Sequence, residues 1–250
     1  MQTFINWARF LRNMTLIEIL KDQRQELERG LGQMTLVHRE AEKMLHPDSS
    51  LIRVVSGVRR CGKSVLIYQF LKDKKFGYVN FDDDRLLEVK PNDILVAWYQ
   101  IYGKKLPILF LDEIQNLEHW ELFVNRLHRA GFQIFLTGSN AKLLAREMAT
   151  HLTGRHRTLE LFPFSFNEYL KAHQFTEDLG TTQGRSMVLQ HLQEYLLRGG
   201  FPEIVVKKEE HGAYLRELYQ RVVERDIVSR YHIAHQKTLK EIARSVMSNP

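Results

Sequence analysis

The spacing of hydrophobic positions divides the chain into three regions. In the first fifty residues apolar side chains recur at helical spacing, and Thr15 with Glu18 three residues later forms the pattern of a capping box. From residue 51 to residue 165, short apolar runs without alternation are separated by helix-like stretches, and after that the pattern is helical again. We therefore expect an N-terminal helical segment (1–50), a core (51–165) and a helical lid that leads into a C-terminal domain (166–250).

The middle region predicts a parallel β-sheet. Apolar runs that do not alternate with polar residues are typical of strands buried on both faces, and the intervening stretches are long enough to be crossover helices. The expected strands lie at 51–55, 77–81, 108–111, 133–137 and, more weakly, 158–161, and the expected helices at 63–72, 92–101 and 119–130. The predicted fold class is therefore α/β.

The loop after the first expected strand carries the most specific motif. Residues 57–64, GVRRCGKS, match the phosphate-loop pattern G-x-x-x-x-G-K-[ST] in full. Such a loop points backbone N–H groups and a helix N-terminus at phosphate oxygens. Lys63 is expected to bridge the β- and γ-phosphates of ATP, and Ser64 to bind Mg²⁺. The expected nucleotide-binding residues are Gly57, Val58, Arg59, Arg60, Cys61, Gly62, Lys63, Ser64 and Val65.

Two adjacent carboxylates end the strand expected at 108–111. Asp112 can hold Mg²⁺ through its water shell, and Glu113 can act as general base toward the attacking water. The alternative is that the pair only caps the helix that follows. The same alternative, capping of the next turn, is favoured for the three aspartates at 82–84. The position of Asp112 and Glu113 downstream of the phosphate loop favours the catalytic interpretation.

Three other residues are weaker candidates for the same site. Ser139 or Asn140, after the strand expected at 133–137, can orient water, or else form an ordinary Gly-Ser-Asn turn. Arg155 precedes the last expected strand and can reach a γ-phosphate in its own or a neighbouring subunit as an arginine finger. A solvated basic turn is the alternative for Arg155.

Composition limits the compartment and the partners. The net charge of +6 among 250 residues permits an anionic partner without requiring one. The single cysteine excludes an internal disulfide and fits the cytoplasm. No membrane role is expected, because arginines interrupt the apolar N-terminus. Cys61 itself is hypothesised to be an oxidisable thiol, because a helix N-terminus and Lys63 would lower its pKa; the alternative is a small residue tolerated at a variable position.

Taken together, these motifs resemble a known family. Over residues 50–230, the chain is similar to prokaryotic AAA-superfamily ATPases related to the archaeal ATPases, in the blocks SGVRRCGKS, VNFDDDRL, ILFLDEIQNLEHWE, IFLTGSNAKLL, LTGRHRTLELFPFSFNEYL and GGFPE. The resemblance implies a P-loop fold of the additional-strand, catalytic-glutamate type, with the strand at 133–137 between the other two key strands. It also supports Arg155 as the finger. Similar proteins begin nearer the loop and usually continue into a C-terminal domain of unknown function, which we expect to be cut off here.

The function expected from these residues is Mg²⁺-dependent ATP hydrolysis coupled to a conformational change. The alternatives are a slow or non-hydrolysing nucleotide-gated switch, which would keep the same motifs, and, less favoured, a small-molecule kinase. A homo-oligomer, DNA and an unidentified protein are the candidate partners. In the helix expected at 212–230, arginines alternate with acidic residues, which is more typical of a salt-bridged face than of a DNA-binding track.

Overall fold

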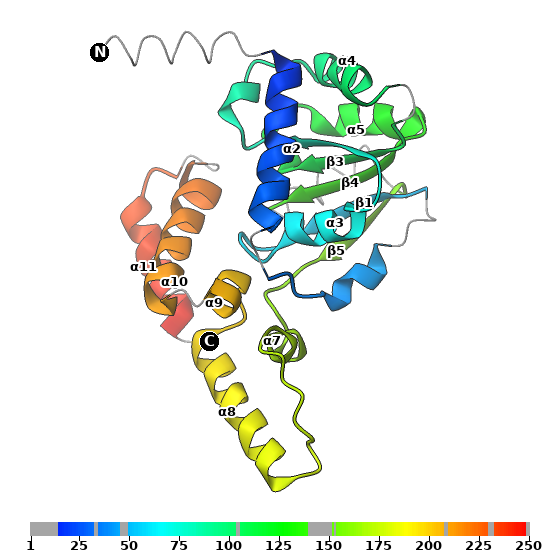
Figure 1. The fold of residues 1–250 in the computed structure, drawn as a ribbon. Coiled ribbons are helices and arrows are strands. Elements are labelled where there is room, and N and C mark those ends of the chain that lie inside the picture. The colour runs from blue at the N-terminus through cyan, green and yellow to red at the C-terminus, as the bar shows by residue number, and fades with distance from the viewer. Residues whose placement is uncertain are drawn as a thin grey trace, which may run out of the picture. The chain divides into compact units, whose positions relative to one another are not determined.

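The structure of the chain is a computed structural model that divides into two compact units. It describes residues 15–32, 35–45, 50–103, 106–139, 152, 154–207, 210–229 and 233–248. The first unit comprises Met1–Phe162 and the second Pro163–Pro250 (Figure 1). No helix among the described residues is both long enough and apolar enough to cross a bilayer.

The first unit is built on a five-stranded sheet in the order β2-β3-β4-β1-β5. The strands are β1 (Ile52–Ser56), β2 (Phe76–Asn80), β3 (Ile108–Asp112), β4 (Gln133–Gly138) and β5 (His156–Glu160). All neighbouring pairs are parallel. The predicted α/β class with a parallel sheet is confirmed, and β4 lies between β1 and β3, as the resemblance implied. Because the strands are parallel, the loops after β1, β3 and β4 all lie at the end of the sheet where the strands finish.

Helices cover both faces of this sheet (Figure 1). One face packs against α2 (Leu16–Gly32), α4 (Pro91–Tyr102) and α5 (Trp120–Arg129), and the other against α3 (Lys63–Leu71). Burial on two faces explains why β1 and β3 are buried along their whole length and show no alternation. The apolar residues of α5 recur at helical spacing and therefore share one face, which is buried: Trp120, Phe123, Val124 and Leu127.

The second unit is helical in every described element. It contains α7 (Phe166–Ala172), α8 (Thr182–Arg198), α9 (Pro202–Lys207), α10 (His211–Arg221), a π-helical segment Val222–Ser229 and α11 (Gln236–Ser248). A capping box at Ser165 begins α7, and Gly199 with φ of 78° ends α8. Arg221 forms an ion pair with Glu217 at 2.6 Å, which agrees with a salt-bridged face on this helix.

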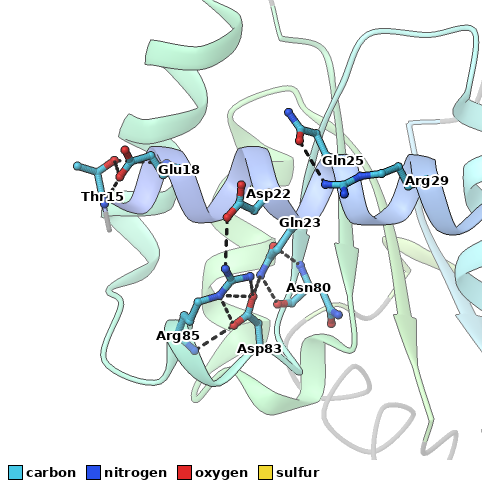
Figure 2. Close-up of polar contacts among 9 residues, drawn as sticks. All are labelled: Thr15, Glu18, Asp22, Gln23, Gln25, Arg29, Asn80, Asp83 and Arg85. Atoms are coloured by element: carbon cyan, nitrogen blue, oxygen red, sulfur yellow. Dashed lines mark hydrogen bonds and ion pairs between the residues drawn. The ribbon is translucent and has the colours of Figure 1, made fainter. Parts of the chain in front are cut away.

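One buried side chain of the helix α2 pairs with the edge strand β2. Gln23 is only 3% exposed. Its amide nitrogen donates to the carbonyl oxygen of Asn80 at 3.1 Å, and its amide oxygen accepts from the Asn80 N–H at 3.0 Å, as Figure 2 shows. The same nitrogen donates to Asp83 at 2.8 Å. Gln23 therefore pairs with the last residue of an edge strand in place of another strand, which protects that edge.

Replacing Gln23 should loosen this helix. In Gln23→Ala the backbone groups of Asn80 and the carboxylate of Asp83 lose their partner, and we expect the free energy of unfolding to fall by about 1–3 kcal/mol. Urea denaturation of the whole chain measures this. The matched control is Gln25→Ala, an exposed position on the same helix, which should change stability by less than about 0.5 kcal/mol. Equal losses in the two variants would show that the buried amide is not what holds α2.

Candidate functional site

The loop between β1 and α3 has a backbone that only particular residues adopt. Gly57 has φ of 143°, Arg60 of 64° and Gly62 of 94°. A Cβ on Gly57 would lie 2.1 Å from the carbonyl oxygen of Leu161, so no larger residue fits at this position without a shift of the backbone. Gly62 stands immediately before the first residue of α3. The loop thus curves back over the N-terminus of that helix, as the motif predicted.

Lys63 lies inside the curve of this loop. Its side chain belongs to the first residue of α3 and is nearly buried, at 5% exposed. The ammonium group donates to the carbonyl oxygens of Gly57 and Val58, each at 3.1 Å. A cation is therefore held where the loop's backbone and the positive end of the helix dipole converge, which is a site suited to an anionic group.

Asp112, at the end of β3, is connected by hydrogen bonds to three other elements. Its carboxylate accepts hydrogen bonds from the hydroxyl groups of Ser64 in α3 at 2.9 Å, of Tyr78 in β2 at 3.1 Å, and of Thr137 in β4. It is 4% exposed, and this burial raises the pKa of Asp112, although the hydrogen bond from Thr137 opposes the shift. Burial and the nearby charge of Asp112 raise the pKa of Tyr78 well above its ordinary value.

The oxygen atoms around Asp112 fit a magnesium ion. A carboxylate and a hydroxyl group, from Asp112 and Ser64, are hard donors of the kind that Mg²⁺ takes, and it commonly uses only one or two such protein ligands. A buried carboxylate without a cation is costly, so a bound metal would relieve the desolvation of Asp112. The buried hydroxyl oxygen of Ser56, just before the loop, has no hydrogen-bond partner in the described part of the chain.

Glu113 follows with an unusual backbone. Its φ of 50° and ψ of 46° lie in the left-handed region, which costs a residue other than glycine about 1–3 kcal/mol. The Glu113 N–H donates to the Thr137 hydroxyl at 2.9 Å. Its carboxylate accepts from Gln115 at 2.5 Å. Strain of this kind concentrates at functional sites, and here it turns the residue after Asp112 out of line with β3.

Two of these partners were not predicted from sequence. Tyr78 was treated as part of an apolar strand, and Thr137 only as the end of another. A signal for Thr137 exists, since it is a polar residue within the buried strand β4. No such signal marks Tyr78, because a tyrosine is ordinary in a strand. The contact with Asp112 depends on the register of β2 beside β3, which pairs Tyr78 with Phe110.

Arg155 lies at the end of the sheet where the strands begin, opposite the end that carries the phosphate loop. Its carbonyl oxygen accepts from the N–H of Ile52 at the start of β1, and its guanidinium donates to Asn125 at 2.7 Å. The loop follows the other end of β1, five residues away, or about 16 Å along an extended strand. Of the two alternatives for an arginine finger at Arg155, this position does not favour a contact within the same chain, and a contact from a neighbouring subunit stays a prediction.

The other weak candidates fare differently. Ser139 directly follows β4 and lies 3.4 Å from the amide nitrogen of Gln115, so it is beside Glu113. Asn140 lies outside the described residues. Asp83 caps the short helix that begins at Asp84, because its side chain accepts from the N–H of Arg85. Capping was the favoured interpretation for that acidic run, and for Asp83 it is confirmed.

Cys61 does not lie at the mouth of the loop. It is buried, packed in the apolar cluster beneath α3. Burial raises the pKa of its thiol, although Lys63 and Arg39 act in the opposite direction. The hypothesis of an acidic, oxidisable thiol is therefore wrong, because burial outweighs the positive charges. Arg39, which sequence reasoning missed, donates to the Cys61 carbonyl at 2.9 Å and to the Phe162 carbonyl at 2.7 Å, so it braces the loop from behind.

Two family models match parts of the chain. A family model described as an AAA domain matches residues 49–170, and one described as a domain of unknown function (DUF8612) matches residues 189–250. The second match lies in the region (166–250) where we expect a helical lid to lead into a C-terminal domain. Among solved structures, the S. cerevisiae Hsp104–ADP complex aligns with a TM-score of 0.44 and 17% identity, covering 89% of this chain and 40% of that one.

Two relatives carry the likeness across most of the chain. An uncharacterized protein of Methanocaldococcus jannaschii is 37% identical over 86% of the chain and 49% of its own length. An uncharacterized protein of Haemophilus influenzae is 34% identical over 81% of the chain and 52% of its own length. The chain thus spans about half the length of these relatives. The chain therefore carries an AAA domain at residues 49–170, followed by a domain of unknown function at residues 189–250, and is similar to uncharacterized archaeal and bacterial proteins.

Proposed function

We propose that the chain binds ATP with Mg²⁺ and hydrolyses it, and that hydrolysis is coupled to a conformational change. The observation that carries this proposal is the contact between Ser64 and Asp112 at 2.9 Å. It joins the phosphate-loop helix to the acidic strand, with Glu113 as the next residue. With β4 between β1 and β3, the arrangement supports the additional-strand, catalytic-glutamate type of P-loop ATPase.

Each residue has a distinct role in the proposed reaction. The loop from Gly57 to Ser64, with Val65 after it, holds the triphosphate, and Lys63 offsets the charge of its terminal phosphates. Ser64 and Asp112 hold Mg²⁺, which would neutralise charge on the phosphate oxygens. Glu113 takes a proton from the attacking water.

The residues that complete the site come from elsewhere in the chain. Ser139, and Asn140 after it, would orient the water that Glu113 activates. Arg155 would act on the nucleotide of a neighbouring subunit, which makes a homo-oligomer the first partner to test. DNA is a weaker proposal, because at least one arginine of the expected helix, Arg221, is already paired with Glu217. The described residues do not indicate the chemistry of a protein partner.

Release of phosphate from ATP tests the proposal against its alternatives. We expect steady phosphate release in Mg²⁺ without any added acceptor, and its loss when EDTA removes the metal. A small-molecule kinase would release phosphate poorly until an acceptor was added. A nucleotide-gated switch would bind ATP in Mg²⁺ and turn it over much more slowly than about 1 s⁻¹, the low end of typical turnover numbers. Release that is unaffected by EDTA would contradict the assignment of Ser64 and Asp112.

A further inference from the structure

A glutamine side chain connects two of the residues proposed to handle water. Gln115 lies in the short helix Ile114–Asn116 that follows β3. Its amide nitrogen donates to the Glu113 carboxylate at 2.5 Å and to the Ser139 hydroxyl at 3.4 Å. Its amide oxygen is buried and has no hydrogen-bond partner among the residues that the structure describes. Both contacts of the amide nitrogen are partly buried, so water competes with them less than it would at an exposed surface.

The bridge joins the ends of two neighbouring strands. Glu113 follows β3, Ser139 follows β4, and these strands are paired in the sheet. The backbone of Glu113 is already tied to β4, since its N–H donates to Thr137. Gln115 adds a second tie, from the carboxylate itself. Both the main chain and the side chain of Glu113 are therefore held from the strand that lies between the phosphate loop and the acidic strand.

The chemistry of an amide limits what Gln115 can do there. It cannot take a proton from water at neutral pH, but its N–H groups can hold one carboxylate oxygen of Glu113 and fix the rotation of that side chain. With one oxygen engaged, the other carboxylate oxygen of Glu113 is the one left to accept a proton. A general base works only when its oxygen is within hydrogen-bond reach of the water, and a misplacement of about 1 Å can cost a hundredfold in rate.

We propose that Gln115 is a positioning residue for hydrolysis, which aligns the Glu113 carboxylate and links it to Ser139 at the end of β4. This inference rests on the proposed function. It assigns to Gln115 no contact with ATP or Mg²⁺. Loss of Gln115 should accordingly lower the rate of the chemical step and leave nucleotide binding as it was.

Two variants of Gln115 and one control test this role. In Gln115→Ala we expect kcat for phosphate release to fall roughly ten- to a hundredfold, with the Kd for ATP within about twofold of the wild type. Gln115→Glu keeps the shape, loses the donor and sets a second carboxylate against Glu113, so its kcat should fall at least as far. Asn116→Ala is the matched control, since Asn116 is exposed on the same turn and contacts Asp82 at 3.3 Å. It should keep the wild-type kcat.

The link to Ser139 has its own measurement. Ser139→Ala and the double variant with Gln115→Ala complete a cycle, and a bridge predicts that the two losses in kcat do not multiply. Independent losses would overturn the link to Ser139. If Gln115→Ala or Gln115→Glu folds, binds ATP and keeps kcat within twofold, or loses kcat only in step with ATP affinity, the positioning role is wrong.

These outcomes separate the inference from the function on which it rests. Wild-type release that is abolished by Glu113→Gln but not slowed by Gln115→Ala would retain the ATPase and overturn the role of Gln115 alone. A wild-type chain that binds ATP and releases no phosphate would overturn both. A Glu113→Gln variant as active as the wild type would overturn the role of Glu113 as the base and, with it, the role of Gln115, and hydrolysis would have to be assigned to other residues. Circular dichroism of every variant guards against a loss of folding being mistaken for a loss of catalysis.

Discussion

Glu113→Gln should bind ATP as well as the wild type and lose nearly all of its turnover. The substitution keeps the size of the side chain and removes the group that takes the proton from water, an effect worth about a hundred- to ten-thousandfold in rate. Asp112, Ser64 and Lys63 are untouched, so the groups proposed to hold Mg²⁺ and the phosphates remain. Single-turnover hydrolysis with enzyme in excess measures the chemical step, and titration with a fluorescent ATP analogue measures binding.

The same substitution at Glu118 is the control for this experiment. Glu118 is exposed and lies five residues further along the same connection between β3 and α5. Glu118→Gln changes the net charge by the same amount and should leave the single-turnover rate within about twofold. Were Glu113→Gln to hydrolyse ATP at the wild-type rate, Glu113 would not be the base, and hydrolysis would have to be assigned to other residues or abandoned. Equal losses in both variants would point to an effect of charge rather than of position.

The parts of this site that depend on local sequence were predictable. A phosphate loop is specified by glycines at fixed positions and by the helix that begins at Lys63, all within eight residues. The buried strands can be recognised as runs of apolar residues, because a parallel sheet with helices on both faces has no side that faces water. The position of the adjacent pair Asp112 and Glu113 at the end of a buried strand could be predicted for the same reason, since the strand and its end are contiguous in sequence.

The parts that depend on packing between distant segments were not. Tyr78 reaches Asp112 because β2 lies beside β3, and Arg39 reaches the Cys61 carbonyl from a segment before the sheet. Neither contact can be predicted from the spacing of these residues along the sequence. Cys61 shows the opposite error, in which a local argument about charge was sound but burial was larger.

The placement of Arg155 follows from topology that sequence already contained. A residue that precedes a parallel strand lies at the N-terminal end of the strands, whereas the phosphate loop follows β1 and lies at their C-terminal end. Of the two alternatives for Arg155, the contact within one subunit therefore conflicts with the predicted sheet itself. What the structure adds is the contact with Asn125, which anchors the Arg155 side chain at the N-terminal end. A second copy of the chain is the remaining way to bring such an arginine to a nucleotide.

Gly57→Ala should be the most destabilising single substitution in the phosphate loop. A methyl group at this position would lie 2.1 Å from the Leu161 carbonyl oxygen and 3.2 Å from the Cys61 sulfur. Leu161 cannot easily retreat, because its N–H donates to the Ser56 carbonyl at 2.8 Å. With φ of 143°, alanine also strains the backbone. Overpacking and strain together predict a loss of about 2–6 kcal/mol in the free energy of unfolding, against the total of about 5–15 kcal/mol that is usual for a folded domain.

Gly103→Ala separates the steric part of this effect from the backbone part. Gly103 ends α4 with φ of 73° and ψ of −179°, and a Cβ there would meet no atom of the described residues within 4 Å, so only backbone strain of about 1–3 kcal/mol is expected. Chemical denaturation of both variants gives the difference, which is the contribution of the contact between Gly57 and Leu161. If Gly57→Ala folds, it should bind ATP poorly while Gly103→Ala binds normally, because only the first substitution moves the backbone that faces the phosphates. Equal stability and equal ATP binding in the two variants would mean that the close approach of the loop to Leu161 does not shape the nucleotide site.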